Sequence, residues 1–343
     1  MSERKLVTIE KVLETRPIEG SDFIEQIKIR GWNLVSKKGE FNVGDKCVFF
    51  EVDSLIPEGK ECFEFLRKSC WNERLKGFRI KTVKLRGVIS QGLALPISYF
   101  PEFKNLQIGV DVTEKLNVTV YEPYIDLNIN ANAKGAFPSF LKDTSLDRIQ
   151  NLSNPFEEYK GKEIIITEKI DGTSHTCYIN NGEVGMCSKN LDLKIEPDKK
   201  DVRNELFITL DIENKLRKLN KNIAIQGEII GKSIQRKNYT KFSDNKNYDF
   251  YVYRIYDIDT RTFYTIEESK RIAEILDLNF VRIIEKREMF ETLEEAIEYS
   301  NGKSNFYDGI MEGIVVTVED KNETLYDLTQ FKVLSPNYLL KEK

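Results

Sequence analysis

The stretch EIIITEKIDGTSHTCYINNGEVGMCS, residues 163–188, decides how the second half of the chain folds. Its apolar and β-branched residues predict a hairpin of strands with a turn from Asn180 to Gly182. Capping boxes that begin at Thr265 and Thr292 predict two later helices. Further strands are expected at IAIQGEIIG, YDFYVYRIYDID, EGIVVTVED and LTQFKVL, and a surface helix at DVRNELFITLDIENKLRKLNKN. This half therefore indicates an α+β domain.

One lysine lies between two acids in TEKIDGTSH, Thr167–His175. In a strand that ends at Gly172, Lys169 and Asp171 project to one face and Glu168 to the other. A neighbouring aspartate raises the pKa of a lysine and keeps it protonated. An isolated Lys-x-Asp-Gly is therefore by default an unreactive ion pair. The rest of the sequence must decide whether Lys169 is a nucleophile.

The composition excludes several classes of protein. A chain of 343 residues with 40% hydrophobic and 31% charged residues suggests two or three globular domains. One histidine argues against Ser-His-Asp triads and catalytic zinc sites, which need more. Five cysteines without a Cys-x-x-Cys pair indicate a reducing compartment. With no apolar run of about 20 residues and no secretory signal, we expect a cytoplasmic protein without a membrane partner.

Residues 1 to about 100 carry about five short strand patterns closed by turn residues, which favours a small barrel of the OB type. The segment GFRIKTVKLRG interleaves basic and aromatic residues, as a barrel that tracks a phosphate backbone would. An ordinary solvated strand face is an equally good interpretation. The Asn-rich segment that follows sets a boundary between about 120 and 135, so we expect domains at 1–125 and 126–343.

Lone carboxylates interrupt two apolar strands, Glu228 in QGEIIG and Glu312 in MEGIVV. A buried carboxylate is costly without a cation or a hydrogen-bonding partner. Together with Asp171 they could hold a hydrated Mg²⁺, which prefers oxygen ligands. Such an ion would offset the negative charge that keeps Lys169 protonated, and Lys332 in QFKVL would lower the pKa of Lys169 further.

The order of these motifs resembles the covalent nucleotidyltransferase superfamily, which includes polynucleotide ligases and mRNA capping enzymes. The matching segments are Lys169-Ile170-Asp171-Gly172, Ser188-Lys189-Asn190, Glu228, Tyr248-Asp249-Phe250-Tyr251-Val252, Glu312-Gly313 and Phe331-Lys332. In that superfamily the motif lysine attacks the α-phosphate of a nucleoside triphosphate. The resemblance implies a lysyl–nucleotide intermediate.

A barrel that precedes this domain resembles the fifth family of ATP-dependent RNA ligases, and the likeness covers almost the whole chain. It implies an N-terminal OB-fold β-barrel followed by an adenylyltransferase domain of antiparallel sheets and helices. The implied cofactors are ATP and Mg²⁺ or Mn²⁺. The implied partner is RNA with 3′-OH and 5′-phosphate ends, as nicks in a duplex, and the protein is expected to be a monomer.

The resemblance also assigns roles to individual residues. Lys169 would be the adenylated nucleophile, and Lys332 would contact the α-phosphate and stabilise charge there. Phe250 would stack on adenine, although a core aromatic is as good an interpretation. The other expected nucleotide contacts are Arg148, Glu168, Lys189 and Glu228. The expected metal ligands, acting through the water shell of the ion, are Asp171, Glu228 and Glu312.

Two positions depart from that pattern. Lys189 stands where an arginine is common, and a lysine cannot make the bidentate contact of an arginine. Gln330 replaces the first lysine of a Lys-x-Lys motif, so adenylylation is slower or another basic residue supplies the cation. The competing hypotheses are a DNA ligase or guanylyltransferase and a non-catalytic RNA-binding relative. His175 is expected to be a packed or hydrogen-bonded residue.

Overall fold

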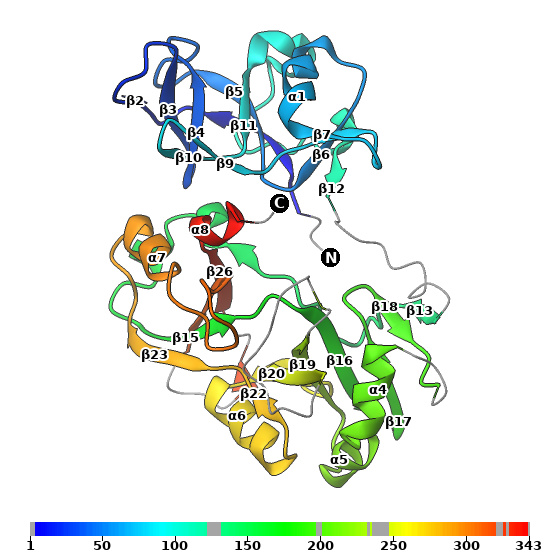
Figure 1. Ribbon diagram of the computed structural model, residues 1–343. Coiled ribbons are helices and arrows are strands. Elements are labelled where there is room, and N and C mark those ends of the chain that lie inside the picture. The colour runs from blue at the N-terminus through cyan, green and yellow to red at the C-terminus, as the bar shows by residue number, and fades with distance from the viewer. Residues whose placement is uncertain are drawn as a thin grey trace. The chain divides into compact units, whose positions relative to one another are not determined.

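The computed structural model describes residues 4–121, 132–196, 201–231, 234, 247–319, 325–326 and 329–341 (Figure 1). The chain divides into one compact unit of residues 1–125 and 339–343 and a second of residues 126–338. Much of the connection expected between 120 and 135 lies outside the described residues. In the described part of the chain, no helix has the length and apolar character needed to cross a membrane.

The first unit is built of short antiparallel strands arranged in several small sheets. The described strands are β1 (Val7–Lys11), β2 (Glu14–Pro17), β3 (Ile24–Ile29), β4 (Trp32–Lys37), β5 (Lys46–Phe50), β6 (Ser54–Pro57), β7 (Trp71–Asn72), β8 (Gly77–Arg79), β9 (Thr82–Leu85), β10 (Val88–Gln91), β11 (Leu93–Pro96) and β12 (Thr119–Val120). Their sheets have the orders β1-β5-β11, β2-β3-β4, β12-β6-β8-β7 and β10-β9. Helix α1 (Arg67–Cys70) is a single turn.

Strand β5 lies at the centre of this unit because both of its faces are buried. Val48 and Phe50 pack into one hydrophobic core, and Cys47 and Phe49 pack into another. The continuous apolar run of β5 follows from this position, since a strand covered on both faces does not alternate with polar residues.

The basic segment GFRIKTVKLRG forms β8 and β9 with a break at Ile80 and Lys81. Arg79 makes two contacts within the first unit. Its Nη2 lies 3.6 Å from Asp53 Oδ1, and its guanidinium lies 3.9 Å from the centre of the Tyr121 ring. Lys81 is exposed. The segment is therefore partly engaged in intramolecular contacts and partly open to a ligand.

The second unit contains two sheets. Among the described residues, nine strands form the larger sheet: β13 (Ala133–Ala136), β18 (Leu191–Leu193), β17 (Glu183–Cys187), β16 (Thr173–Asn180), β19 (Ile223–Gly231), β20 (Tyr248–Asp257), β21 (Thr262–Tyr264) and β25 (Leu325–Tyr326) in that order, with β22 (Asn279–Phe280) beside β20. In the same described part, five strands form the smaller sheet in the order β14 (Asp147–Arg148), β26 (Thr329–Leu334), β24 (Gly313–Val318), β15 (Glu163–Lys169) and β23 (Ile283–Glu288).

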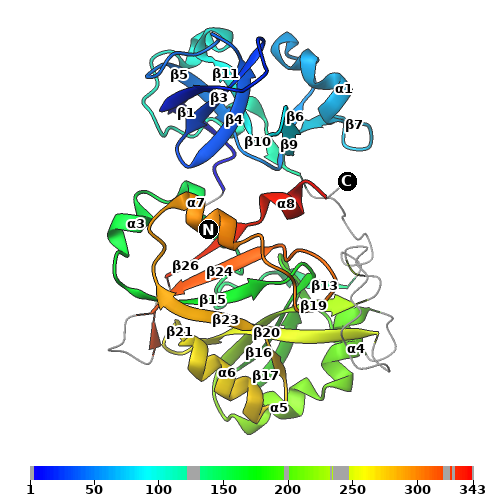
Figure 2. The ribbon, with the colours of Figure 1, turned by 60° about the vertical axis from the view of Figure 1, so that its left-hand side comes forward.

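Helices cover one face of each sheet. Helices α4 (Val202–Thr209), α5 (Ile212–Lys218) and α6 (Ile266–Ile275) pack on the larger sheet (Figure 1). Helix α7 (Leu293–Tyr299) packs on the smaller one (Figure 2). Short helices α3 (Pro155–Glu158) and α8 (Pro336–Leu339) flank the smaller sheet. The opposite face of the larger sheet carries a second hydrophobic cluster, which includes Tyr178, Ala224 and Tyr256.

The expected helices are observed only in part. The predicted starts of α6 and α7 are confirmed, because Thr265 accepts a hydrogen bond from the Glu268 N–H and Thr292 accepts one from the Glu295 N–H. The single helix expected at DVRNELFITLDIENKLRKLNKN is wrong. It is two helices, α4 and α5, separated at Asp211, whose φ of 51° is incompatible with a continuous right-handed helix.

The stretch 163–188 is only partly the expected hairpin. Strands β16 and β17 do pair around a turn in which Asn181 and Gly182 both have positive φ, as the turn sequence predicts. Strand β15 pairs instead with β23 and β24 in the smaller sheet. Residues 170–172 therefore carry the chain from one sheet to the other, directly after Lys169.

Candidate active site

Lys169 ends β15 at the point where the chain leaves the smaller sheet. Its Nζ donates a hydrogen bond to Glu312 Oε2 at 2.6 Å, and Lys169 stands opposite Gly313 in the register of β15 and β24. Gly172 lies so near β19 that a Cβ at this position would be 2.3 Å from the carbonyl oxygen of Ile229. Glycine is required there, and its small size brings Lys169 close to Glu228.

The charges around Lys169 favour its protonated form. Burial alone would lower the pKa of Lys169, but Glu312, Glu228 and Asp171 outweigh burial and raise it. The protein's own groups therefore hold an ammonium ion at this position. The expected lowering of this pKa requires additional positive charge.

The pKa values of the neighbouring carboxylates are shifted as well. Burial raises the pKa of Glu228 to about 8; Lys169 opposes this shift, and Glu312 and Asp171 reinforce it. Burial likewise raises the pKa of Glu312, against the lowering effect of Lys169. These acids are thus close enough to repel one another, and a cation among them would stabilise their ionised forms.

This donor set fits a hydrated divalent cation. Among the described residues, no three Asp, Glu, His or Cys side chains lie close enough together to hold a metal ion directly. The carboxylates of Asp171, Glu228 and Glu312 nevertheless interact through the same small region around Lys169. Mg²⁺ commonly keeps several waters and binds through few carboxylates, which suits this spacing.

Asp171 is held by a residue that the sequence did not indicate. The hydroxyl of Tyr338, a buried residue of α8, donates a hydrogen bond to Asp171 Oδ2. This contact joins the end of the second unit to the segment after Lys169. No motif in the sequence marks Tyr338, because 167 positions separate the two partners.

Arg148 and Lys332 lie side by side. Strand β14 pairs with β26 in parallel, with Arg148 opposite Lys332. Arg148 is buried, and the charge of Lys332 lowers the pKa of Glu312. The structure therefore brings the two predicted phosphate-contacting cations to the edge of the carboxylate cluster.

Three predicted nucleotide contacts lie elsewhere. Glu168 faces away from Lys169, where it accepts hydrogen bonds from Ser304 Oγ at 2.7 Å and from the Asn305 N–H. Lys189 is exposed in the turn between β17 and β18. Phe250 is 1% exposed and packs in the core under α4, α5 and α6. In this structure the ring of Phe250 therefore has no open face on which a base could stack.

Tyr253 faces the site instead. The register of β19 and β20 shifts between Gln226 and Gly227, which leaves Tyr253 as an extra residue of a β-bulge. Its side chain lies near Ser174, Thr144 and Glu228, and burial raises its pKa to about 12. Strict alternation along YDFYVYRIYD cannot reveal this position, because a bulge changes the face.

His175 is a core residue, as expected. It is 1% exposed, its Nε2 lies 3.1 Å from Cys177 Sγ, and its ring meets the Phe250 ring edge-on at 5.2 Å. Burial and the charge of Arg203 lower the pKa of His175 to about 3. The histidine is neutral at physiological pH and takes no part in the site.

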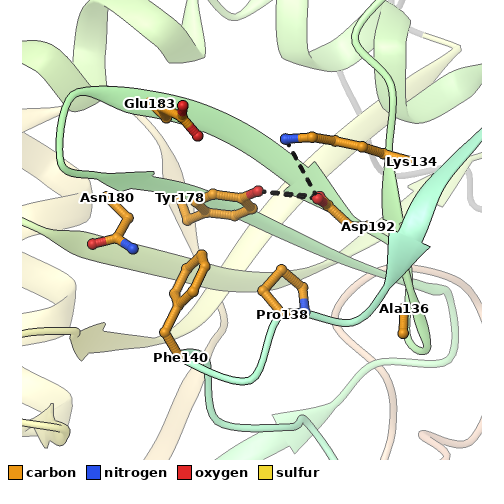
Figure 3. Close-up of a pocket in the computed structure, with 8 residues that line it drawn as sticks. All are labelled: Lys134, Ala136, Pro138, Phe140, Tyr178, Asn180, Glu183 and Asp192. Carbon is orange, nitrogen blue, oxygen red and sulfur yellow. Dashed lines mark hydrogen bonds and ion pairs between the residues drawn. The ribbon is translucent and has the colours of Figure 1, made fainter.

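A separate small cavity of about 220 Å³ lies between β13 and the hairpin of β16 and β17 (Figure 3). Of its two acidic residues, Glu183 and Asp192, the second already has partners. Figure 3 shows Lys134 and Tyr178 directed at Asp192, with Lys134 Nζ at 3.7 Å and the Tyr178 hydroxyl at 3.2 Å from its carboxylate. Sites for small molecules commonly exceed about 300 Å³.

Both units are similar to known protein families. A family model described as an OB-fold domain matches residues 6–97, which confirms the fold expected for the N-terminal unit, and one described as RNA ligase matches residues 162–334. Together with the sheets and helices of the second unit, this confirms the α+β class. No curated protein matches the chain.

Solved structures of an RNA ligase from Naegleria gruberi are similar to the whole chain. The complex with PPi has 36% sequence identity and a TM-score of 0.88, and the match covers 99% of each chain. A mutant with AMP and Mn and another with ATP and Mn each have 36% identity and a TM-score of 0.90, again over 99% of each chain.

Proposed function

Because this chain belongs to the RNA ligase family, we propose that it is an ATP-dependent ligase that seals RNA through a covalent lysyl-AMP on Lys169. The observation that carries the proposal is the position of Lys169 at the end of β15, 2.6 Å from Glu312 and within the field of Glu228 and Asp171. The similar ligase from Naegleria gruberi has been solved with ATP and Mn and with AMP and Mn.

In the first step the neutral amine of Lys169 attacks the α-phosphorus of ATP. A phosphorus–nitrogen bond forms, the bond between the α-phosphorus and its bridging oxygen breaks, and pyrophosphate leaves with the electron pair. Since the carboxylates raise the pKa of Lys169, the amine must lose a proton as their charge is offset. A divalent cation, when bound, supplies that positive charge and organises the phosphates of ATP.

Two basic side chains of the protein would contact the phosphates. Lys332 would contact the α-phosphate, where a fixed positive charge stabilises the charge that develops during transfer. Arg148, its neighbour across β14 and β26, would contact the nucleotide or the RNA 5′-phosphate. Asp171, Glu228 and Glu312 would hold the divalent cation through its water shell, and Tyr338 would orient Asp171.

The later steps use the same site. The AMP moves from Lys169 to the 5′-phosphate of RNA, which breaks the phosphorus–nitrogen bond and leaves an RNA-adenylate. The RNA 3′-OH then attacks that phosphate and releases AMP. Both RNA ends must therefore be held together, and we propose that the natural substrate is a nick in duplex RNA sealed by a single protein chain.

We expect a duplex RNA with a 3′-OH/5′-phosphate nick to be sealed at least about tenfold faster than the same ends in single strands, because a template holds the reacting groups in place. Sealing is measured on labelled strands with ATP and Mg²⁺. Equal rates on both substrates would contradict nick specificity. Faster sealing of an all-DNA nick would favour a DNA ligase, and labelling by GTP alone would favour a guanylyltransferase.

We further propose that Tyr253 replaces Phe250 as the aromatic contact of adenine. Stacking of a base on an aromatic ring is worth about 1–3 kcal/mol. Substitution Tyr253→Leu should therefore raise the half-saturating ATP concentration for adenylylation by about tenfold. The matched variant Phe250→Leu should leave it within about twofold and lower the free energy of unfolding by about 1 kcal/mol. The reverse pattern would return the role to Phe250.

A further inference from the structure

Arg254 is a buried arginine of β20 that joins three segments. Its Nε donates a hydrogen bond to Gln226 Oε1 at 2.7 Å, its Nη1 to Gln330 Oε1 at 3.0 Å, and its Nη2 to the Asp143 carbonyl at 2.6 Å. The side chain is 4% exposed. One guanidinium thus connects β19 and β20 of the larger sheet with β26 of the smaller sheet and with the segment before β14.

Gln330 is suited to this neighbour in a way that lysine is not. Its Oε1 accepts from Arg254, and its Nε2 donates to Thr317 Oγ1 on β24 at 2.9 Å. A lysine at 330 could accept no hydrogen bond and would place a second positive charge beside a buried guanidinium. The positive charge expected on β26 therefore lies on β20, and the amide of Gln330 is its acceptor.

The contacts of Arg254 also hold in place the chain segment that precedes Arg148. Gln226, which accepts from Arg254, donates its own Nε2 to the Lys142 carbonyl at 2.6 Å. Residues 142–144 are thereby fastened to the larger sheet immediately before β14, which carries Arg148. On β26, Gln330 precedes Lys332 by two positions, so both side chains share a face.

We propose that Arg254, paired with Gln330, is a positioning residue that sets the distance between the cations Arg148 and Lys332 and the nucleophile Lys169. The inference rests on the proposed function, because it concerns the same transfer of AMP. It also accounts for the glutamine in the Lys-x-Lys position: the missing cation is present, but it acts from another strand and through contacts within the protein.

An exchange of the two side chains tests this pairing. The variants are Arg254→Gln, Gln330→Lys and the double variant, with the exposed residues Arg261→Gln and Gln107→Lys as matched controls. The single-turnover rate of AMP attachment at saturating ATP, the half-saturating ATP concentration and the folded fraction are measured for each. Rates are expressed per folded molecule.

Each single variant should lower the maximal rate by about 10- to 100-fold, the effect of a small misplacement of reacting groups, with the half-saturating ATP concentration changed by less than about threefold. The double variant should recover at least about tenfold over either single variant, because one cation again faces one amide.

Two results would overturn the role of Arg254: single variants as fast as wild type per folded molecule, or losses that multiply in the double variant instead of cancelling. A wild-type protein that takes up no AMP would instead refute the proposed function itself. Labelled wild type with unaffected variants would refute only the positioning role.

Discussion

Replacing Lys169 by alanine should abolish the attachment of AMP, lowering its rate by at least about 10⁴-fold, the scale of losing a covalent nucleophile. The side chain of Lys169 is partly buried, and its Nζ lies 2.6 Å from Glu312 Oε2. Intact-protein mass spectrometry after incubation with ATP and Mg²⁺ measures the adduct directly. We expect a single AMP on wild type and none on Lys169→Ala.

The variant Lys169→Arg separates the charge of this side chain from its nucleophilicity. An arginine keeps the ion pair with Glu312 but stays protonated at any accessible pH, so it should preserve the fold and take up no AMP. The exposed Lys286, which pairs with Glu267 on the surface, is the matched control, and Lys286→Ala should be labelled like wild type. An adduct on Lys169→Ala would show that the nucleophile lies elsewhere.

The sequence predicts the parts of the site that depend on local pattern. Glu228 and Glu312 are lone carboxylates in apolar strands, a pattern that predicts a charged partner for each. Both interact with Lys169 in the structure. The strand at 223–231 and the starts of α6 and α7 are also where propensity and capping place them. Such features are encoded within a few neighbouring residues.

Features that depend on strand pairing could not be predicted in the same way. Whether β15 continues into a hairpin or changes sheet after Lys169 is decided by distant partners, β23 and β24. The bulge that directs Tyr253 to the site depends on the register of β19 with β20. Strict alternation along one strand therefore cannot tell a core phenylalanine from a tyrosine beside the site.

Long-range contacts between side chains could not be predicted from the sequence either. Glu168 is adjacent to Lys169 in sequence, yet it is committed to Ser304 and Asn305 on the opposite face. The cation that the pattern lacked at Gln330 is contributed by Arg254, 76 positions away. Proximity to a motif is therefore weaker evidence for a role than the face on which a residue lies.

Replacing Lys332 by alanine should lower the maximal rate of AMP attachment by about 10²–10³-fold, the typical cost of losing one group that stabilises transition-state charge. Lys332 is partly buried on β26 opposite Arg148, and its charge lowers the pKa of Glu312. The substitution therefore removes both a phosphate contact and a stabiliser of the ionised carboxylate. Single-turnover labelling at saturating ATP measures the first effect.

The second effect has a definite sign in the pH profile. Without Lys332 the ionised form of Glu312 is less stable, so its pKa rises and the acidic limb of the rate profile should move to higher pH. The variant Lys332→Arg keeps the charge and should leave that limb in place while its altered geometry lowers the rate by about tenfold. The control variant is Lys341→Ala, at an exposed position. A Lys332→Ala profile that only scales down, without moving, would show that Lys332 acts on the phosphate alone and that Glu312 is ionised without it.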